Sequence, residues 1–198
     1  MKYILSVLIT CLTLTGFAQF AEDATSISPL LIGETIPDIT LVNTDNQPVQ
    51  LHDVFRYKPT VLIFYRGGWC PYCNAHLSKI AEIEDDIIKA GYQVVAVSPD
   101  APENLNVTID KKELKYTLLS DGEGKLSTAV GIAFKAPGSK WKTNQLQKHS
   151  GGKNPGYLPV PSVFVVDKNG DIMFEYINPN YRHRLDGKLL MAVLNALK

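Results

Sequence analysis

An apolar segment that leads directly into a helical pattern constrains the fold more than any other feature of this sequence. Thr60–Tyr65 is a continuous run of apolar, β-branched and aromatic residues, which is typical of a central strand covered on both faces. From Pro71 onward, apolar residues recur at helical spacing until Gly91 ends the pattern. A buried strand followed this closely by an amphipathic helix predicts a layered α/β fold in which helices pack on a sheet.

The rest of the chain repeats this alternation, which favours a mostly parallel sheet flanked by helices. Further strands are expected at residues 92–97 and 116–119, and further helices at 102–114, 124–130 and 189–197.

Two hairpins add antiparallel strands. Residues 38–42 and 49–51 alternate in polarity around a turn-rich stretch and predict an N-terminal β-hairpin. Residues 162–166 and 171–176 flank Asn169-Gly170, a strong turn signal, so these strands are expected to be antiparallel neighbours. The expected fold class is therefore α/β, with a central mixed sheet.

Length and charge indicate one globular domain without a polyanion-binding role. The chain has 198 residues, of which 45% are hydrophobic, and 20 basic residues balance 20 acidic ones. A protein that binds nucleic acid usually carries a basic excess, so no nucleic-acid partner is expected. We expect a single domain over residues 33–198, preceded by a leader at 19–32. The segment 136–159, rich in Gly and Pro, is expected to be a long loop or insertion.

The first residues have the pattern of a signal peptide. Lys2 precedes an apolar run that ends at Leu14, and Gly16-Phe17-Ala18 offers small residues for cleavage before Gln19. The run is shorter than the ~20 residues that a membrane span needs. We therefore expect residues 1–18 to be removed and the protein to be exported, periplasmic or secreted. A retained N-terminal membrane anchor is the alternative.

Cys11 would leave with the signal peptide, so the mature chain would carry Cys70 and Cys73 alone. A C-x-x-C loop is too short to constrain the unfolded chain much, and the spacing therefore suits redox chemistry or metal binding better than a structural disulfide. Cys70 would lie at the helix start, where unpaired N–H groups and the helix dipole lower the pKa of a thiol. Cys73, one turn further on the same face, would be close enough to form a disulfide with it. Arg66 either adds positive charge nearby or is a solvated residue at the strand end.

Metal binding is a second reading of the same cysteines. Cys70, Cys73 and His76 together could bind copper or zinc, which would make the chain a carrier. A structural zinc site normally has four ligands, however, and a polar surface histidine is the favoured interpretation of His76. No nucleotide-binding fingerprint or haem attachment site is present, so no cofactor is expected.

The segment Trp69–Cys73 resembles the W-C-x-x-C motif of the thioredoxin superfamily, with the Pro-Tyr insert of glutaredoxins. In that superfamily a cis proline packs against the dithiol at the start of a late strand, and the resemblance places it at Pro161. A cis Val160–Pro161 bond is thus expected, with a trans proline at a strand start as the alternative.

The residues next to the dithiol and next to Pro161 are expected to form the substrate surface. Trp69, Tyr72 and Val160 are the candidates, and packing against the loop is the alternative for both aromatic side chains.

Over nearly the whole mature chain, the sequence is similar to the peroxiredoxins of the alkyl hydroperoxide reductase / thiol-specific antioxidant group. The segments that carry this similarity, in chain order, are Gly33–Leu41, Arg66–Cys73, Val95–Asp100, Tyr116–Asp121, Leu158–Pro161 and Asn178–Arg184. The resemblance implies a thioredoxin-like fold and a thiol-dependent peroxidase. It also implies a thiol electron donor, either thioredoxin-like or relayed through a membrane, and it sets no oligomeric state.

The sequence departs from the peroxiredoxin pattern at the dithiol itself. By alignment, the peroxidatic cysteine falls on Cys73, its helper threonine on Cys70 and its helper arginine on Pro161. Arg182 or Arg184 are candidates to replace that arginine. Two assignments therefore remain open: Cys73 attacks peroxide and Cys70 resolves, or Cys70 attacks and Cys73 resolves, as in a thioredoxin-like disulfide oxidoreductase.

Overall fold

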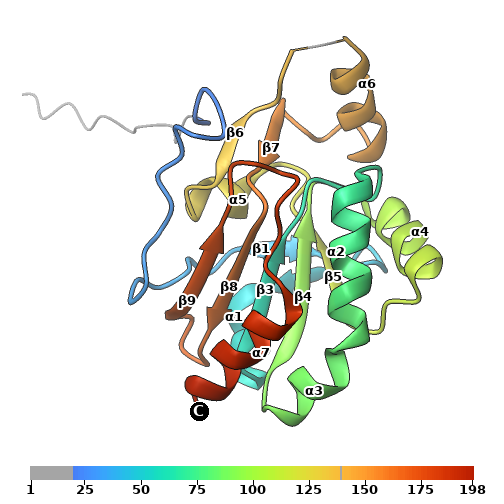
Figure 1. Ribbon diagram of the computed structural model, residues 1–198. Helices are drawn as coiled ribbons and strands as arrows, with labels where there is room; N and C mark the ends of the chain where they lie inside the picture. The colour runs from blue at the N-terminus through green and yellow to red at the C-terminus, as the bar shows by residue number, and fades with distance from the viewer. Residues whose placement is uncertain (1–19, 139) are drawn as a thin grey trace, which may run out of the picture.

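Two-sided burial of the central strand sets the architecture. The computed structural model describes residues 20–138 and 140–198, and strand β3 (Thr60–Phe64) runs through their middle (Figure 1). Val61 and Ile63 point into one buried cluster, and Leu62 and Phe64 point into a second cluster on the opposite face. Because successive side chains of a strand alternate between faces, both faces of the sheet are covered, as the sequence predicts.

The main sheet is mixed, with the strand order β2-β1-β5-β4-β3-β8-β9. β3, β4 and β5 are parallel, whereas β8 pairs antiparallel with β3, and β9 and β1 join the two sides antiparallel. The predicted mixed sheet and N-terminal hairpin are thereby confirmed. The other strands of this sheet are β1 (Thr40–Val42), β2 (Pro48–Gln50), β4 (Gln93–Ser98), β5 (Thr117–Ser120), β8 (Ser162–Val166) and β9 (Ile172–Ile177).

Helices cover both faces of this sheet. The first cluster receives apolar side chains from α2 (Pro71–Glu82), α3 (Glu84–Lys89), α4 (Pro102–Lys112) and α7 (Gly187–Ala196). The second cluster receives them from α1 (Leu51–Tyr57), α5 (Lys125–Ala129) and α6 (Lys140–His149). Burial of these two clusters supplies the main driving force for folding.

Two local differences from the predicted elements have simple causes. The helix expected up to Gly91 is interrupted at Ile83, whose backbone angles (φ −112°, ψ 7°) leave the helical region and separate α2 from α3. Helix α1 begins at Leu51, where a strand was expected. Its core contact rests on Leu51 and Phe55, which lie one helical turn apart and are both fully buried.

The segment 136–159 is not a plain loop, because it contains α6 and strand β7 (Tyr157–Pro159), which pairs antiparallel with β6 (Ala133–Lys135). The Asn154 side chain orders this segment by accepting the N–H groups of Gly156 and Tyr157 and donating to the Tyr157 carbonyl. The Tyr157 hydroxyl donates to the Asp121 carbonyl. These polar groups are buried, and their mutual hydrogen bonds replace the water that they would bind in an open loop.

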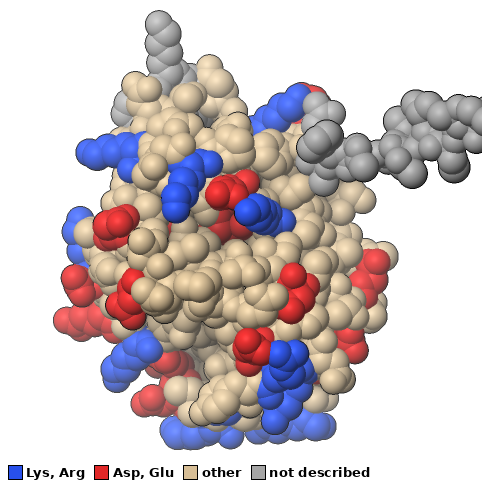
Figure 2. Space-filling model, turned by 180° about the vertical axis from the view of Figure 1, so that it is seen from behind, with Lys and Arg blue, Asp and Glu red and all other residues tan. Residues whose placement is uncertain are grey.

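The charge on the surface bears on binding partners, and the N-terminal segment bears on export. Basic and acidic side chains are interspersed over most of the face shown in Figure 2. The expected signal peptide, residues 1–18, lies outside the described residues. Within residues 20–138 and 140–198, no helix combines the length and apolar character that crossing a bilayer requires.

Candidate active site

The turn between β3 and α2 places both cysteines at the start of a helix. Cys70 is the N-cap residue of α2, with extended backbone angles (φ −92°, ψ 113°), and Pro71 is the first helical residue. The Cys70 N–H donates to the Gly67 carbonyl at 3.1 Å, and the Cys70 carbonyl accepts the Asn74 N–H at 3.0 Å. The side chain of Cys70 therefore lies where the free N–H groups of the helix favour an anion, as the sequence predicts.

Asp100 holds this turn from the carboxyl end of β4. Its Oδ2 atom accepts the Gly68 N–H at 2.6 Å, and the Asn74 side chain donates to the Gly68 carbonyl at 2.8 Å. Gly68 is thus held through both its N–H and its carbonyl. Burial of the Asp100 carboxyl raises its pKa to about 7, although the hydrogen bond from Gly68 opposes the shift.

Two glycines allow the turn to pass this close to its neighbours. Gly67 has φ +133°, and a Cβ atom there would lie 2.7 Å from Oδ1 of Asp100. A Cβ atom at Gly68 would lie 2.2 Å from Oγ1 of Thr108. Any larger residue would displace the turn and the cysteine that follows it.

The two cysteines differ in access. Both are free thiols; Cys70 is 2% exposed and lines the pocket described below, whereas Cys73 is 0% exposed. A substrate molecule in that pocket meets Cys70 first.

The two cysteines also differ in pKa. The pKa of Cys70 is lowered to about 6, mainly by hydrogen bonding from the Cys73 thiol. The lowering is increased by the Cys73 N–H and by the positive charges of Arg66 and Arg184, whereas partial burial of the thiol opposes it. Burial raises the pKa of the Cys73 thiol well above its ordinary value, and hydrogen bonding to Cys70 adds to the rise. Near neutral pH the pair therefore holds a Cys70 thiolate next to a Cys73 thiol, and the thiolate is the reactive form of a cysteine.

Two arginines flank the dithiol from different elements. Arg66 follows β3, is 8% exposed, and its guanidinium lies 4.3 Å from the centre of the Tyr181 ring and 5.3 Å from that of Trp69. The Arg184 Nη2 atom lies 3.5 Å from Sγ of Cys73, and its Nη1 atom donates to the carbonyl of Tyr181. Arg66 is therefore a buried residue of the site and not a solvated one.

Of the two arginines considered as replacements for the missing helper, Arg184 reaches the dithiol. Arg182 is exposed and lies 5.8 Å from the centre of the Tyr181 ring.

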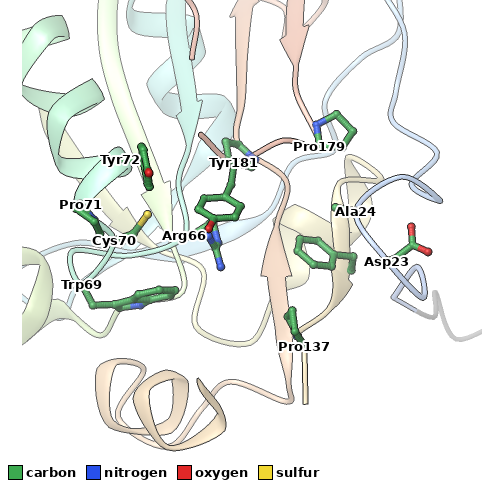
Figure 3. Close-up of a pocket in the computed structure, with 12 residues that line it drawn as sticks. Asp23, Ala24, Arg66, Trp69, Cys70, Pro71, Tyr72, Pro137, Pro179 and Tyr181 are labelled. Atoms are coloured by element: carbon green, nitrogen blue, oxygen red, sulfur yellow. The ribbon is translucent and has the colours of Figure 1, made fainter. Parts of the chain in front are cut away.

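A pocket of about 480 Å³ opens beside Cys70 (Figure 3). Its walls are mostly apolar and aromatic, and Arg66 supplies a positive charge next to the sulfur. Trp69, Tyr72 and Pro161 line it, as the sequence predicts. The lining residues are Asp23, Ala24, Arg66, Trp69, Cys70, Pro71, Tyr72, Phe134, Pro137, Pro161, Pro179 and Tyr181.

Val160 is not part of this surface. It is fully buried in the second core cluster, and its N–H donates to the Ile132 carbonyl at 2.9 Å, which turns its side chain into the core. The prediction that Val160 contacts substrate is therefore corrected.

The Val160–Pro161 bond is trans, which corrects the expected cis bond. Both residues are hydrogen-bonded to neighbouring backbone in this trans form. The Pro161 carbonyl accepts the Asn178 N–H at 3.2 Å, and the Val160 N–H donates to the Ile132 carbonyl. The trans form is also the lower-energy state of most X–Pro bonds. Pro161 nevertheless lines the same pocket as Cys70, so its predicted place beside the dithiol is correct.

His76 is buried, at 5% exposure, and is not the surface histidine that was expected. Burial lowers its pKa to about 4, helped by the positive charges of Arg184 and Lys79. Among residues 20–138 and 140–198, no group of three or more His, Cys, Asp or Glu side chains converges in a way that could hold a metal ion. The copper-carrier alternative therefore has no ligand set in this part of the chain.

The sequence interpretation missed Asp100 as part of the site, and for Tyr181 it favoured a solvated cluster before the last helix over a place at the border of the site. Asp100 ends the segment Val95–Asp100, one of the segments that carry the similarity to the peroxiredoxins. Its position after a parallel strand adjacent to β3 was the available signal, since the carboxyl ends of such strands meet at one edge. Tyr181 comes from a distant segment, and no spacing rule connects it to Cys70.

Comparison with known proteins gives a family match over most of the chain. Residues 32–175 match the model of the AhpC/TSA family. Peroxiredoxin Q, chloroplastic, of Sedum lineare is 30% identical over 146 residues, which cover 74% of this chain and 68% of that protein. Peroxiredoxin Bcp of Escherichia coli K12 is 30% identical over 106 residues, which cover 54% of this chain and 67% of that protein.

The fold also matches solved structures. The crystal structure of reduced Prx3 in complex with H2O2 from Vibrio vulnificus superposes with a TM-score of 0.71 at 17% identity, and the match covers 83% of this chain and 99% of that one. The predicted thioredoxin-like fold is thereby confirmed.

Proposed function

This chain belongs to the AhpC/TSA family of peroxiredoxins, and we propose that its Cys70–Cys73 pair is the centre at which it reduces peroxides. The protein is a thiol-dependent peroxidase that works through a cysteine redox cycle. The observation that supports the residue assignment is the asymmetry of the pair, because Cys70 alone lines the pocket and has the lowered pKa.

The first step is attack of the Cys70 thiolate on one peroxide oxygen. An S–O bond forms, the O–O bond breaks, and the second oxygen leaves as hydroxide or alkoxide and takes up a proton. Cys70 is then a sulfenic acid. Arg66, which lines the pocket beside this sulfur, stabilises the thiolate before the step and the leaving oxygen during it.

The second step closes the disulfide. The Cys73 sulfur attacks the Cys70 sulfur, the S–O bond breaks, and water leaves. The Cys73 thiol must lose its proton for this attack, and the guanidinium of Arg184 at 3.5 Å stabilises the thiolate that forms. Two electrons from an external thiol donor then restore the dithiol.

Trapping the sulfenic acid tests the assignment. With a dimedone-type reagent and peroxide, the variant Cys73→Ser should be labelled at Cys70, and the variant Cys70→Ser should react far more slowly. Rapid labelling of Cys73 in Cys70→Ser would instead support the peroxiredoxin alignment, in which Cys73 attacks first.

A thioredoxin-like disulfide oxidoreductase is the second candidate function. The Cys70-first arrangement favours it, since a low-pKa cysteine at a helix start followed by a buried partner suits attack on a disulfide as well as on a peroxide. The two are separated by comparing the rates at which the reduced protein reacts with hydrogen peroxide and with a protein disulfide. Peroxide turnover near background together with fast disulfide reduction would favour this second candidate.

We further propose that the protein is exported, with residues 1–18 as a cleaved signal peptide, on the pattern of charge, apolar run and small residues there. The thiol electron donor is then thioredoxin-like or relayed through a membrane. The test is fractionation of the source cell followed by N-terminal sequencing; a chain in the cytoplasm that still begins at Met1 contradicts this proposal.

A further inference from the structure

The buried guanidinium of Arg66 has no anionic partner among the protein's described side chains. Its Nε atom has no hydrogen-bond partner within residues 20–138 and 140–198, and the ion pairs found there do not include Arg66. The rings of Tyr181 and Trp69 lie against it, which stabilises the charge only in part. A buried charge of this kind is normally paired, because burial removes the water that would otherwise solvate it.

In the reduced protein, Cys70 itself supplies the missing anion. Its pKa of about 6 makes it a thiolate near neutral pH, and the Arg66 charge contributes to that lowering. Formation of the Cys70–Cys73 disulfide removes this negative charge, because both sulfurs become neutral. The oxidised protein thus keeps the buried cation and loses its anion.

Asp23, a carboxylate on the pocket wall, does not replace the lost thiolate as the partner of Arg66. Asp23 lines the same pocket, but its Oδ1 atom already accepts the Thr25 N–H at 2.8 Å, the Thr25 hydroxyl at 2.7 Å and the Ser26 hydroxyl at 2.9 Å. Figure 3 shows Asp23 on the opposite side of the pocket from Arg66.

We propose that oxidation turns this pocket into an anion-binding site, and that the electron donor it admits is a small thiol with a carboxylate close to its sulfur. The carboxylate binds Arg66, the apolar walls accept the carbon chain, and the thiol meets Cys70, the sulfur that lines the pocket. The inference rests on the proposed function, because it requires the Cys70–Cys73 disulfide to form.

Reduction then follows two exchange steps. A donor thiolate attacks the Cys70 sulfur, an S–S bond forms between donor and Cys70, and the Cys70–Cys73 bond breaks to leave a Cys73 thiolate beside Arg184. A second donor thiolate attacks the donor sulfur of this mixed disulfide. The donor leaves as its own disulfide, the two electrons remain on the protein, and the Cys73 thiolate takes up a proton. The returning Cys70 thiolate pairs with Arg66 again and displaces the carboxylate.

The test uses the full mature chain, oxidised by one equivalent of hydrogen peroxide until thiol counting shows that no free thiol remains. Reduction is followed by stopped-flow fluorescence, since Trp69 adjoins Cys70, with 3-mercaptopropionate and its neutral amide as matched donors. Rate constants are expressed per thiolate. The carboxylate donor should react about tenfold faster, the order expected for one added charge-assisted hydrogen bond.

Variants separate a bound carboxylate from general attraction of anions. Arg66→Gln should remove the advantage of the carboxylate, and Arg66→Lys should retain part of it because the charge remains. Arg182→Gln is the matched control, since it removes the same unit of charge from an exposed neighbouring position and should leave the advantage in place. As a second readout, the unreactive anion hexanoate should bind the oxidised protein more tightly than the reduced one.

The possible results separate failure of the anion-binding proposal from failure of the peroxidase cycle. Equal rate constants for the acid and the amide, or an advantage that survives in Arg66→Gln, would overturn this inference while leaving the peroxidase cycle intact. Equal binding of hexanoate by both redox forms would overturn it as well. If peroxide produces no disulfide at all, the proposed cycle itself is wrong.

Discussion

Replacing Cys73 by Ala or by Ser should shift the pKa of Cys70 by different amounts. The pKa of Cys70 is about 6, against an ordinary value of 9.0, and hydrogen bonding from the Cys73 side chain is the largest cause of that shift. Ala removes this donor, whereas Ser keeps a hydroxyl donor of similar size. Loss of one charge-assisted hydrogen bond, worth about 1.5–3 kcal/mol, should raise the Cys70 pKa by about 1–2 units in Cys73→Ala.

The consequence is a measurable change in the thiolate population. With a pKa of about 6, roughly nine tenths of Cys70 is thiolate at pH 7; with a pKa near 8, the fraction is roughly one tenth. Both variants contain a single cysteine after signal cleavage, so ultraviolet titration of the thiolate, together with the rate of alkylation by iodoacetamide against pH, reports Cys70 alone. Coincident titration curves for the two variants would refute the reasoning, as would a midpoint near 9 in Cys73→Ser.

Three further perturbations test the turn and its partners. Gly68→Ala should lower the free energy of unfolding by about 1–3 kcal/mol and slow peroxide reduction, because the added Cβ would lie 2.2 Å from Oγ1 of Thr108. The double variant with Thr108→Ala should recover part of both losses, as measured by denaturant titration and activity assays. Asp100→Asn should flatten stability against pH. The pKa of Asp100 is about 7 in the folded protein, above the ordinary 3.8, so between these values the folded protein binds a proton that the unfolded chain has released. The free energy of unfolding of the wild type should therefore fall by up to about 4 kcal/mol as pH rises from 4 to 7. Urea titrations should not find this fall in the variant. Arg184→Gln should lengthen the lifetime of the Cys70 sulfenic acid in rapid-quench trapping, since the Cys73 thiolate loses its stabilising cation; an unchanged lifetime would remove Arg184 from the second step.

Local sequence patterns predicted the main elements of the fold correctly. The run at Thr60–Phe64 is a strand buried on both faces, and the Asn169-Gly170 turn joins two antiparallel strands. In both cases the signal and its cause are close together in the chain, since burial and turn chemistry act on neighbouring residues. Elements whose stability depends on distant contacts were missed, including α1, which is short and is held by Leu51 and Phe55 in the core.

The same division applies to the active site. The C-x-x-C spacing and the strand–helix boundary predicted a thiolate at Cys70, because the helix terminus is a local source of positive potential. Burial decided the roles of the other residues. His76 and Arg66 were each open to interpretation as surface residues, and both are enclosed once distant segments pack around them.

The sequence by itself determined that two sulfurs would meet at the first turn of a helix, since three residues of helix bring them to one face. Tertiary structure decided which sulfur is accessible. Folding buries Cys73 in the core, leaves Cys70 on a pocket wall, and brings Asp100 and Arg184 from two other places in the chain to the turn that carries Arg66. A charge is stabilised or destabilised by whatever surrounds it in space, and those surroundings exist only after the chain has folded.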